Sequence, residues 1–166
     1  MMPMPVRWGT ALIAVLSSVA MLAGAPGLVV AGPSKAPVAP VNSANGVALK
    51  GYDPVAYFST GQPTPGSPDV TERWKGATYR FASEGHRELF QADPERYLPQ
   101  YGGYCAYAMS LNRIADIDPA RWKIVEGKLY LNNGRFAHTL WSIDVAGHIA
   151  SADRNWPAYP KAIEPQ

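Results

Sequence analysis

Apolar and polar residues alternate along two pairs of short segments. Residues 70–74 and 78–81 alternate in this way and are joined by three residues that include a glycine, which predicts a β-hairpin. Residues 122–125 and 128–131 flank a Glu-Gly pair and predict a second hairpin. A further short strand is expected over residues 47–51, before a Tyr-Asp-Pro turn.

Helices are predicted from capping residues and from apolar periodicity. Ser83 is a good N-cap for a short helix, and Asp93 followed by Pro94 begins another helical turn. Residues 136–152 place their larger apolar side chains on one helical face, and Gly147 is expected to mark a bend there. Together these elements predict an α+β fold, a small single domain of β-hairpins packed with short helices and a C-terminal helix.

The beginning of the chain follows a different pattern. Arg7 is the only charged residue before residue 35, and the densest apolar run, residues 11–23, is shorter than the roughly 20 residues of a bilayer span. Small residues allow a signal peptidase to cut after Ala25 or Ala31, and we favour Ala31. We therefore expect a Sec-type signal peptide and a periplasmic or secreted protein. The alternative is an uncleaved N-terminal membrane anchor over residues 11–30.

The expected organisation has four parts. A signal peptide covers residues 1–31, a Pro- and Ala-rich linker residues 32–46, the folded domain residues 47–158 and a C-terminal tail residues 159–166. Loss of Arg7 with the signal leaves 14 basic and 13 acidic residues, with no block of like charge. That balance indicates no nucleic-acid partner, and we expect no stable membrane insertion once the signal is removed.

Four strings in the folded part resemble the YHS domain family, in particular its bacterial secreted branch. They are G-Y-D-P-V-A-Y-F at 51–58, Q-Y-G-G-Y-C-A-Y at 100–107, G-K-L-Y-L-N at 127–132 and N-W-P at 155–157. A hairpin ending in Y-x-F and the string A-D-P-E-R-Y fit the same pattern. The resemblance covers residues 47–158 and implies a YHS/TRASH-like α+β domain of hairpins and short helices.

The resemblance also implies where metal ligands would lie. In metal-binding members of the family, cysteines after the D-P-V string and around the end of the hairpin supply soft ligands. The corresponding positions here hold Ala56, Ala82 and His86. Only His86 of the three keeps a side chain that binds copper or zinc.

Cys105 is the only cysteine, so no disulfide can form within the chain. It lies in an uncharged run of small and aromatic residues, 102–108, which we expect to be buried. A thiolate binds copper or zinc or attacks an electrophile, whereas a buried thiol behaves as a small hydrophobe. Met109 offers a thioether for copper(I), although methionine commonly fills cores, and His138 offers a further imidazole. The candidate metal ligands are therefore Cys105, His86, Met109 and His138, and no catalytic residue is assigned.

Three functions are consistent with these residues. The first is an exported binding module that handles a transition metal, copper or zinc. The second is a structural or protein-interaction domain whose aromatic-rich surface meets a protein partner, and the third is a thiol-dependent redox protein that uses Cys105. The chain has no phosphate-binding glycine loop, no H-E-x-x-H pair and no G-x-S-x-G turn, which favours binding over catalysis.

Overall fold

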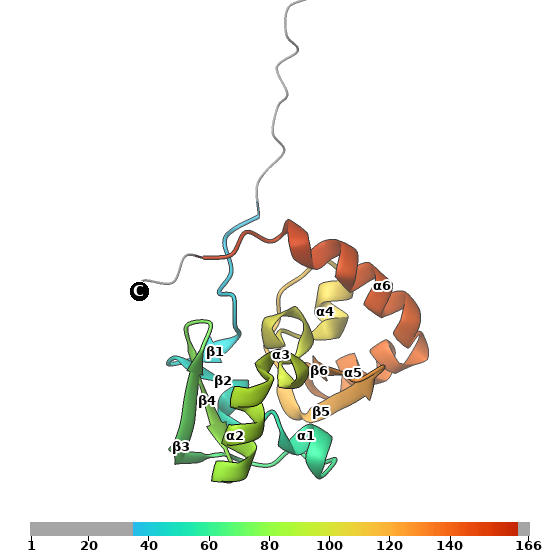
Figure 1. Cartoon of the computed structure of the whole chain (residues 1–166). Helices are drawn as coiled ribbons and strands as arrows, with labels where there is room; N and C mark the ends of the chain where they lie inside the picture. The colour runs from blue at the N-terminus through green and yellow to red at the C-terminus, as the bar shows by residue number, and fades with distance from the viewer. Residues whose placement is uncertain (1–34, 163–166) are drawn as a thin grey trace, which may run out of the picture. The chain divides into compact units, whose positions relative to one another are not determined.

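The structure is a computed structural model and describes residues 35–162. These residues form two small sheets surrounded by short helices, so the predicted α+β class is confirmed (Figure 1). The signal peptide predicted for residues 1–31 lies outside the described residues. Within residues 35–162, none of the helices has the length and apolar character that crossing a bilayer requires.

The larger sheet contains four strands in the order β1-β2-β4-β3. Its β3–β4 hairpin confirms the hairpin predicted over residues 70–74 and 78–81. Lys75 and Gly76 form the turn, and both have positive φ angles. β2 pairs with β4 in parallel through Val47 and Thr78, a long-range pairing that no local signal predicts. The strands are β1 (Ser43–Ala44), β2 (Val47–Ala48), β3 (Ser67–Trp74) and β4 (Ala77–Phe81).

Two of the helices beside this sheet begin at the predicted caps. The Ser83 hydroxyl accepts a hydrogen bond from the His86 backbone N–H, and the Asp93 carboxylate accepts one from Arg96. Phe90 is the buried residue of the longer helix, and its ring packs against the Phe81 ring of β4. The helices are α1 (Ala56–Ser59), α2 (Glu84–Ala92) and α3 (Pro94–Tyr97).

The second hairpin forms the smaller sheet and is also confirmed. Glu126 and Gly127 make its turn, and both have positive φ angles. Helices and 3-10 turns surround this hairpin, and Met109, Tyr130 and Trp141 lie in a second buried cluster there. The remaining elements are η1 (Leu49–Gly51), η2 (Gln100–Gly103), α4 (Ala106–Ser110), β5 (Asp118–Val125), β6 (Lys128–Asn132), α5 (Gly134–Ile143), α6 (Val145–Asn155) and η3 (Trp156–Ala158).

The prediction of a single C-terminal helix over residues 136–152 is wrong, because α5 and α6 are separate helices. The helical conformation is interrupted at Asp144, whose φ of −141° is not helical. Its carboxylate accepts a hydrogen bond of 2.9 Å from Gly147 N–H. A Cβ added at Gly147 would lie 2.1 Å from the same carboxylate. The glycine therefore leaves room for an N-cap and does not mark a bend within one helix.

The two ends of the described range pair with each other. Val38 N–H donates to the Pro160 carbonyl at 2.9 Å, and Ala162 N–H donates to the Val38 carbonyl at 2.8 Å. Val41 and Tyr159 are both buried. The described parts of the linker predicted for residues 32–46 and of the tail predicted for residues 159–166 are thus packed into the domain.

Candidate functional site

The Cys105 sulfur lies where the first turn of α4 meets the start of α5. Cys105 is the N-cap of α4, and its Sγ accepts a hydrogen bond from Ala108 N–H at 3.4 Å. A second N–H, that of Asn133 at the N-cap of α5, donates to the same atom at 3.2 Å. Cys105 is buried, as expected for the uncharged run around it. Its sulfur is therefore held by two backbone donors from segments far apart in the sequence.

The Asn132 side chain lies beside this sulfur, and the sequence analysis did not identify it. It ends β6 and is fully buried, and its Oδ1 lies 3.8 Å from Sγ, where it can accept the thiol proton. The same oxygen accepts a hydrogen bond of 3.1 Å from Tyr107 N–H. Asn132 Nδ2 has no partner among the described residues. A buried amide nitrogen without a partner is costly, although five other buried side-chain nitrogens of the described residues share this feature.

A surface cavity of about 390 Å³ opens above Cys105. Most of its lining is apolar, and Arg113 is its only charged lining residue. Large apolar side chains on its rim, including Phe136, are exposed to solvent. Cys105 is thus buried from bulk water but is one of the residues that line a cavity of a size that suits a small molecule.

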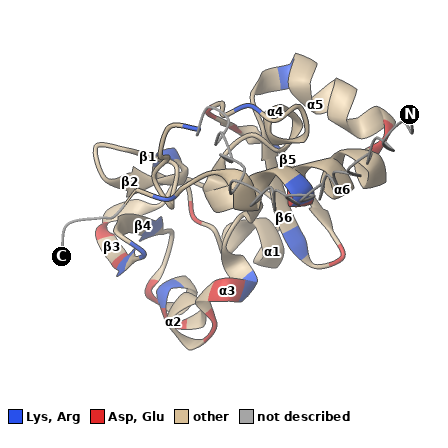
Figure 2. Ribbon diagram, turned by 90° about the horizontal axis from the view of Figure 1, so that it is seen from above, with Lys and Arg blue, Asp and Glu red and all other residues tan. Residues whose placement is uncertain are grey.

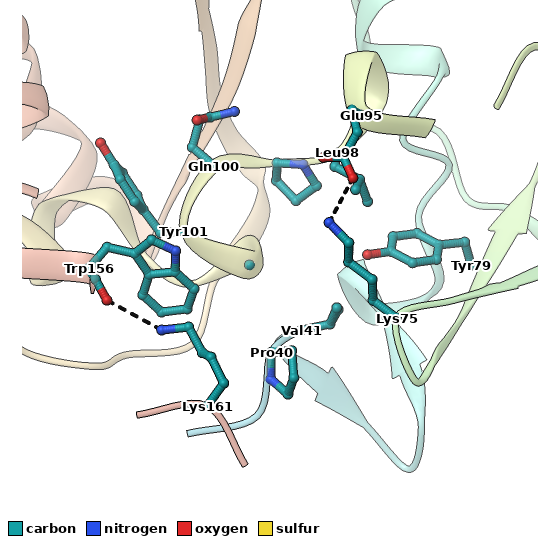
Figure 3. A pocket seen from close by; sticks show the side chains of 12 residues that line it. Pro40, Val41, Lys75, Tyr79, Glu95, Leu98, Gln100, Tyr101, Trp156 and Lys161 are labelled. Atoms are coloured by element: carbon teal, nitrogen blue, oxygen red, sulfur yellow. Dashed lines mark hydrogen bonds and ion pairs between the residues drawn. The ribbon is translucent and has the colours of Figure 1, made fainter. Parts of the chain in front are cut away.

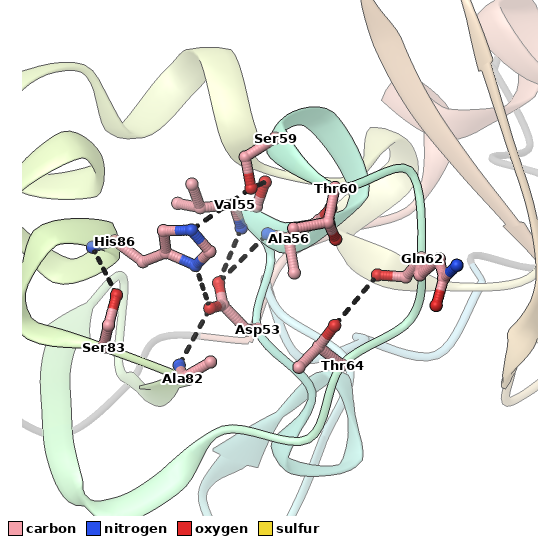
Figure 4. Close-up of polar contacts among 10 residues, drawn as sticks. All are labelled: Asp53, Val55, Ala56, Ser59, Thr60, Gln62, Thr64, Ala82, Ser83 and His86. Atoms are coloured by element: carbon pink, nitrogen blue, oxygen red, sulfur yellow. Dashed lines mark hydrogen bonds and ion pairs between the residues drawn. The ribbon is translucent and has the colours of Figure 1, made fainter.

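Asp53 is buried and forms a second polar centre (Figure 4). Its Oδ1 accepts hydrogen bonds from Val55 N–H at 2.8 Å and from Ala56 N–H at 3.3 Å, at the start of α1. Its Oδ2 accepts from Ala82 N–H at 2.8 Å and from His86 Nδ1 at 2.6 Å. One buried carboxylate therefore joins α1, the end of β4 and α2.

His86 is oriented by this carboxylate. Because Nδ1 faces Asp53, the proton lies on Nδ1 and Nε2 is left as an acceptor, 3.2 Å from the Ser59 hydroxyl. The Ser59 hydroxyl also lies 3.1 Å from the Val55 carbonyl, so its single proton has two acceptors. The order Ser59, His86, Asp53 is that of a nucleophile relay. The four hydrogen bonds to Asp53 also make this carboxylate a structural clamp between three segments.

Ala56, Ala82 and His86 lie close together around the Asp53 carboxylate. Ala56 and Ala82 contact it through backbone N–H groups, and His86 contacts it through Nδ1. Of these three residues, only His86 carries a side chain that binds copper or zinc.

Met109 and His138 lie in other surroundings. Met109 is fully buried in the second cluster. Burial, together with the charges of Arg121 and Lys123, lowers the pKa of His138, and its Nδ1 has no partner within residues 35–162. Met109 N–H donates to the Cys105 carbonyl at 2.9 Å at the start of α4. No side-chain hydrogen bond or ion pair joins any two of Cys105, His86, Met109 and His138 in the described domain. No group of three or more His, Cys, Asp or Glu side chains in that range is placed to hold a metal ion.

Another cavity, of about 320 Å³, lies between the N-terminal segment, α3 and the C-terminal segment (Figure 3). Its two lysines are already engaged. Lys75 pairs with Glu95 at 2.7 Å, and the Lys161 ammonium lies 3.3 Å from the Trp156 ring centre and donates to the Trp156 carbonyl. These contacts stabilise the wall of the cavity and leave the Cys105 cavity as the better candidate site.

Comparison with known proteins identifies no relative. The chain matches no family model, no curated protein and no solved structure. The likeness to the YHS family therefore depends on the strings and positions in the chain itself.

Proposed function

We propose that this chain is an exported YHS-type binding module whose functional atom is the Cys105 sulfur. The observation that carries the proposal is the pair of backbone N–H groups that donate to this sulfur at the wall of a cavity. N–H donors and helix starts stabilise negative charge, and the thiolate is the form of cysteine that attacks electrophiles and binds soft metals.

The chemistry open to this site is that of a single thiol. With no second cysteine in the chain, the Cys105 thiolate attacks one sulfur of a small disulfide and forms a mixed disulfide, while the other sulfur leaves as a thiolate. Asn132 Oδ1 is placed to hold the proton of the resting thiol. Such a site captures one half of a small disulfide as a mixed disulfide and releases it when a thiolate attacks that bond and restores the Cys105 thiolate.

The test is modification of the folded chain lacking residues 1–31 with methyl methanethiosulfonate and with iodoacetamide, followed by intact mass. We expect one complete modification, absent from Cys105→Ser. A reference thiol is supplied by Ser142→Cys in the Cys105→Ser background, because Ser142 is exposed on α5. Reaction at least as fast as that of the reference thiol supports an activated sulfur. Reaction only at denaturant concentrations that unfold the protein rejects the proposal.

Copper or zinc handling is a second candidate, and the orientation of His86 favours it. Metal-ligating histidines usually donate one ring N–H to a carboxylate and present the other nitrogen to the ion, as His86 does with Asp53. Titration with copper(I) and zinc tests it, with Cys105→Ser and His86→Ala as variants. One equivalent bound by the parent and lost in a variant supports the candidate, and no stoichiometric binding by the parent rejects it.

A further inference from the structure

Exposed apolar side chains of the described domain gather at one place. Five large ones are exposed, and three of them, Leu111, Ile114 and Phe136, line the cavity above Cys105, with exposed fractions of 49%, 36% and 76%. They come from the end of α4, the loop that follows it and α5. Single exposed apolar residues are ordinary, but a group around one cavity indicates a binding surface.

The size of this cavity fits a small molecule. Its volume of about 390 Å³ falls within the usual range for ligand pockets. Ala108, Ala115 and Ala137 line it with short apolar side chains, which leaves room between the larger rim residues. An alkyl chain or an apolar ring can therefore be buried against the rim and the walls.

The charge at the cavity selects an anion. Arg113 is the only charged side chain in the lining, and no ion pair engages it within residues 35–162. The carboxylate next in sequence to the lining, Asp116, already pairs with Lys50 at 2.7 Å. Basic and acidic residues are interspersed along the ribbon (Figure 2). A guanidinium in such a place pairs with a carboxylate through two parallel hydrogen bonds.

We propose that the cavity above Cys105 binds a small monomeric amphiphile, an alkyl-chain carboxylate, with its apolar part against Phe136, Leu111 and Ile114 and its carboxylate on Arg113. This inference rests on the proposed function in one respect: it names the ligand class for the cavity that the proposed function also uses. Bound there, the amphiphile covers the Cys105 sulfur and protects it from modification.

The test measures binding of decanoate, by displacement of the anionic fluorophore 1-anilinonaphthalene-8-sulfonate, to the mature chain. Phe136 and Ile143 are both on α5 and both 76% exposed, but only Phe136 lines the cavity. Phe136→Ser should weaken binding about tenfold, because it removes the largest apolar contact, and Ile143→Ser by less than about twofold. Leu111→Ser and Leu89→Ser provide a second matched pair.

Arg113→Gln tests the charge. The substitution should weaken the binding of decanoate and of the anionic fluorophore about tenfold. It should change the binding of the neutral fluorophore N-phenyl-1-naphthylamine less than about twofold. Equal losses for anionic and neutral ligands, or for Phe136→Ser and Ile143→Ser, overturn the proposal. Two further results would overturn it. One is binding to anionic lipid vesicles without binding to decanoate, and the other is a dimer in sedimentation experiments that Phe136→Ser dissociates.

The experiments can reject either proposal without rejecting the other. Cys105→Ser should keep decanoate binding within about twofold, because the sulfur contributes little of the apolar contact. A reactive Cys105 without decanoate binding rejects the amphiphile alone. An unreactive Cys105 with intact, Phe136-dependent binding rejects the thiol role alone.

Discussion

Asp53 and Asn132 are the two fully buried polar residues of the described domain, and they differ in how well their atoms are paired. Both oxygens of Asp53 accept two hydrogen bonds each, so its burial is compensated. Asn132 leaves Nδ2 without a partner among the described residues. The satisfied residue stabilises the fold, whereas the unsatisfied one lies beside the sulfur that we propose as the functional atom.

At the residue scale, we predict that Asp53→Asn lowers the free energy of unfolding by about 3 kcal/mol. The substitution preserves shape, but it turns one acceptor into an NH₂ group that faces N–H donors. The measurement is urea unfolding followed by tryptophan fluorescence. Asp118→Asn is the control, since Asp118 is partly exposed and accepts from Ala120 N–H alone at 3.0 Å. A loss from Asp53→Asn no larger than that of the control would contradict the clamp.

Residue-level chemistry was only partly predictable. Cys105 was expected to be buried because the residues around it are small, aromatic and uncharged, and this is confirmed. Its neighbour Asn132 lies 27 positions away, and His86 lies 33 positions from Asp53. A polar residue that ends an otherwise apolar strand was the one signal in the sequence that pointed to Asn132.

At the element scale, local signals placed most boundaries. Ser83 and Asp93 cap helices as predicted, because a capping bond spans only three residues. The break between α5 and α6 was missed because the apolar residues on either side of Asp144 keep a helical period. The aspartate and the glycine three residues later act as a cap, which periodicity alone does not reveal.

Gly102 is a position where both the backbone conformation and the neighbouring atoms disfavour a side chain. It has a φ of +63°, and an added Cβ would lie 2.2 Å from the Pro40 carbonyl oxygen. Gly127→Ala is the matched control, because its φ of +74° is equally unusual and no atom lies within 4 Å of its added Cβ. We predict that Gly102→Ala lowers the unfolding free energy by about 2 kcal/mol more than Gly127→Ala does, measured by urea titration. Equal losses would show that Pro40 moves freely.

At the scale of the whole molecule, the ends of the described range belong to the packed body. Tyr159 is buried, its ring lies near Trp156, and its hydroxyl donates to the Asn112 carbonyl at 2.7 Å. The pairing of Val38 with Pro160 and Ala162 brings the two ends of that range together. The domain therefore extends beyond the boundaries that composition indicated.

We predict that Tyr159→Ala lowers the unfolding free energy by about 3 kcal/mol, because it removes a buried ring and leaves a carbonyl unpaired. Thermal or urea unfolding of the chain lacking residues 1–31 measures it. Phe136→Ala, an exposed aromatic residue, should cost less than about 0.5 kcal/mol. A Tyr159→Ala protein as stable as its parent would show that this end of the chain is not part of the folded unit.

The sequence by itself determined the α+β class, both hairpins and the helix caps near Ser83 and Asp93, because these depend on residues a few positions apart. Only the tertiary structure decided that Asp53 holds His86, that Asn132 meets Cys105 and that Phe136 shares a cavity with Arg113. Those contacts join positions far apart in the chain. They form because the packing of the sheets and helices around a common core places the segments side by side, and no local pattern records that outcome.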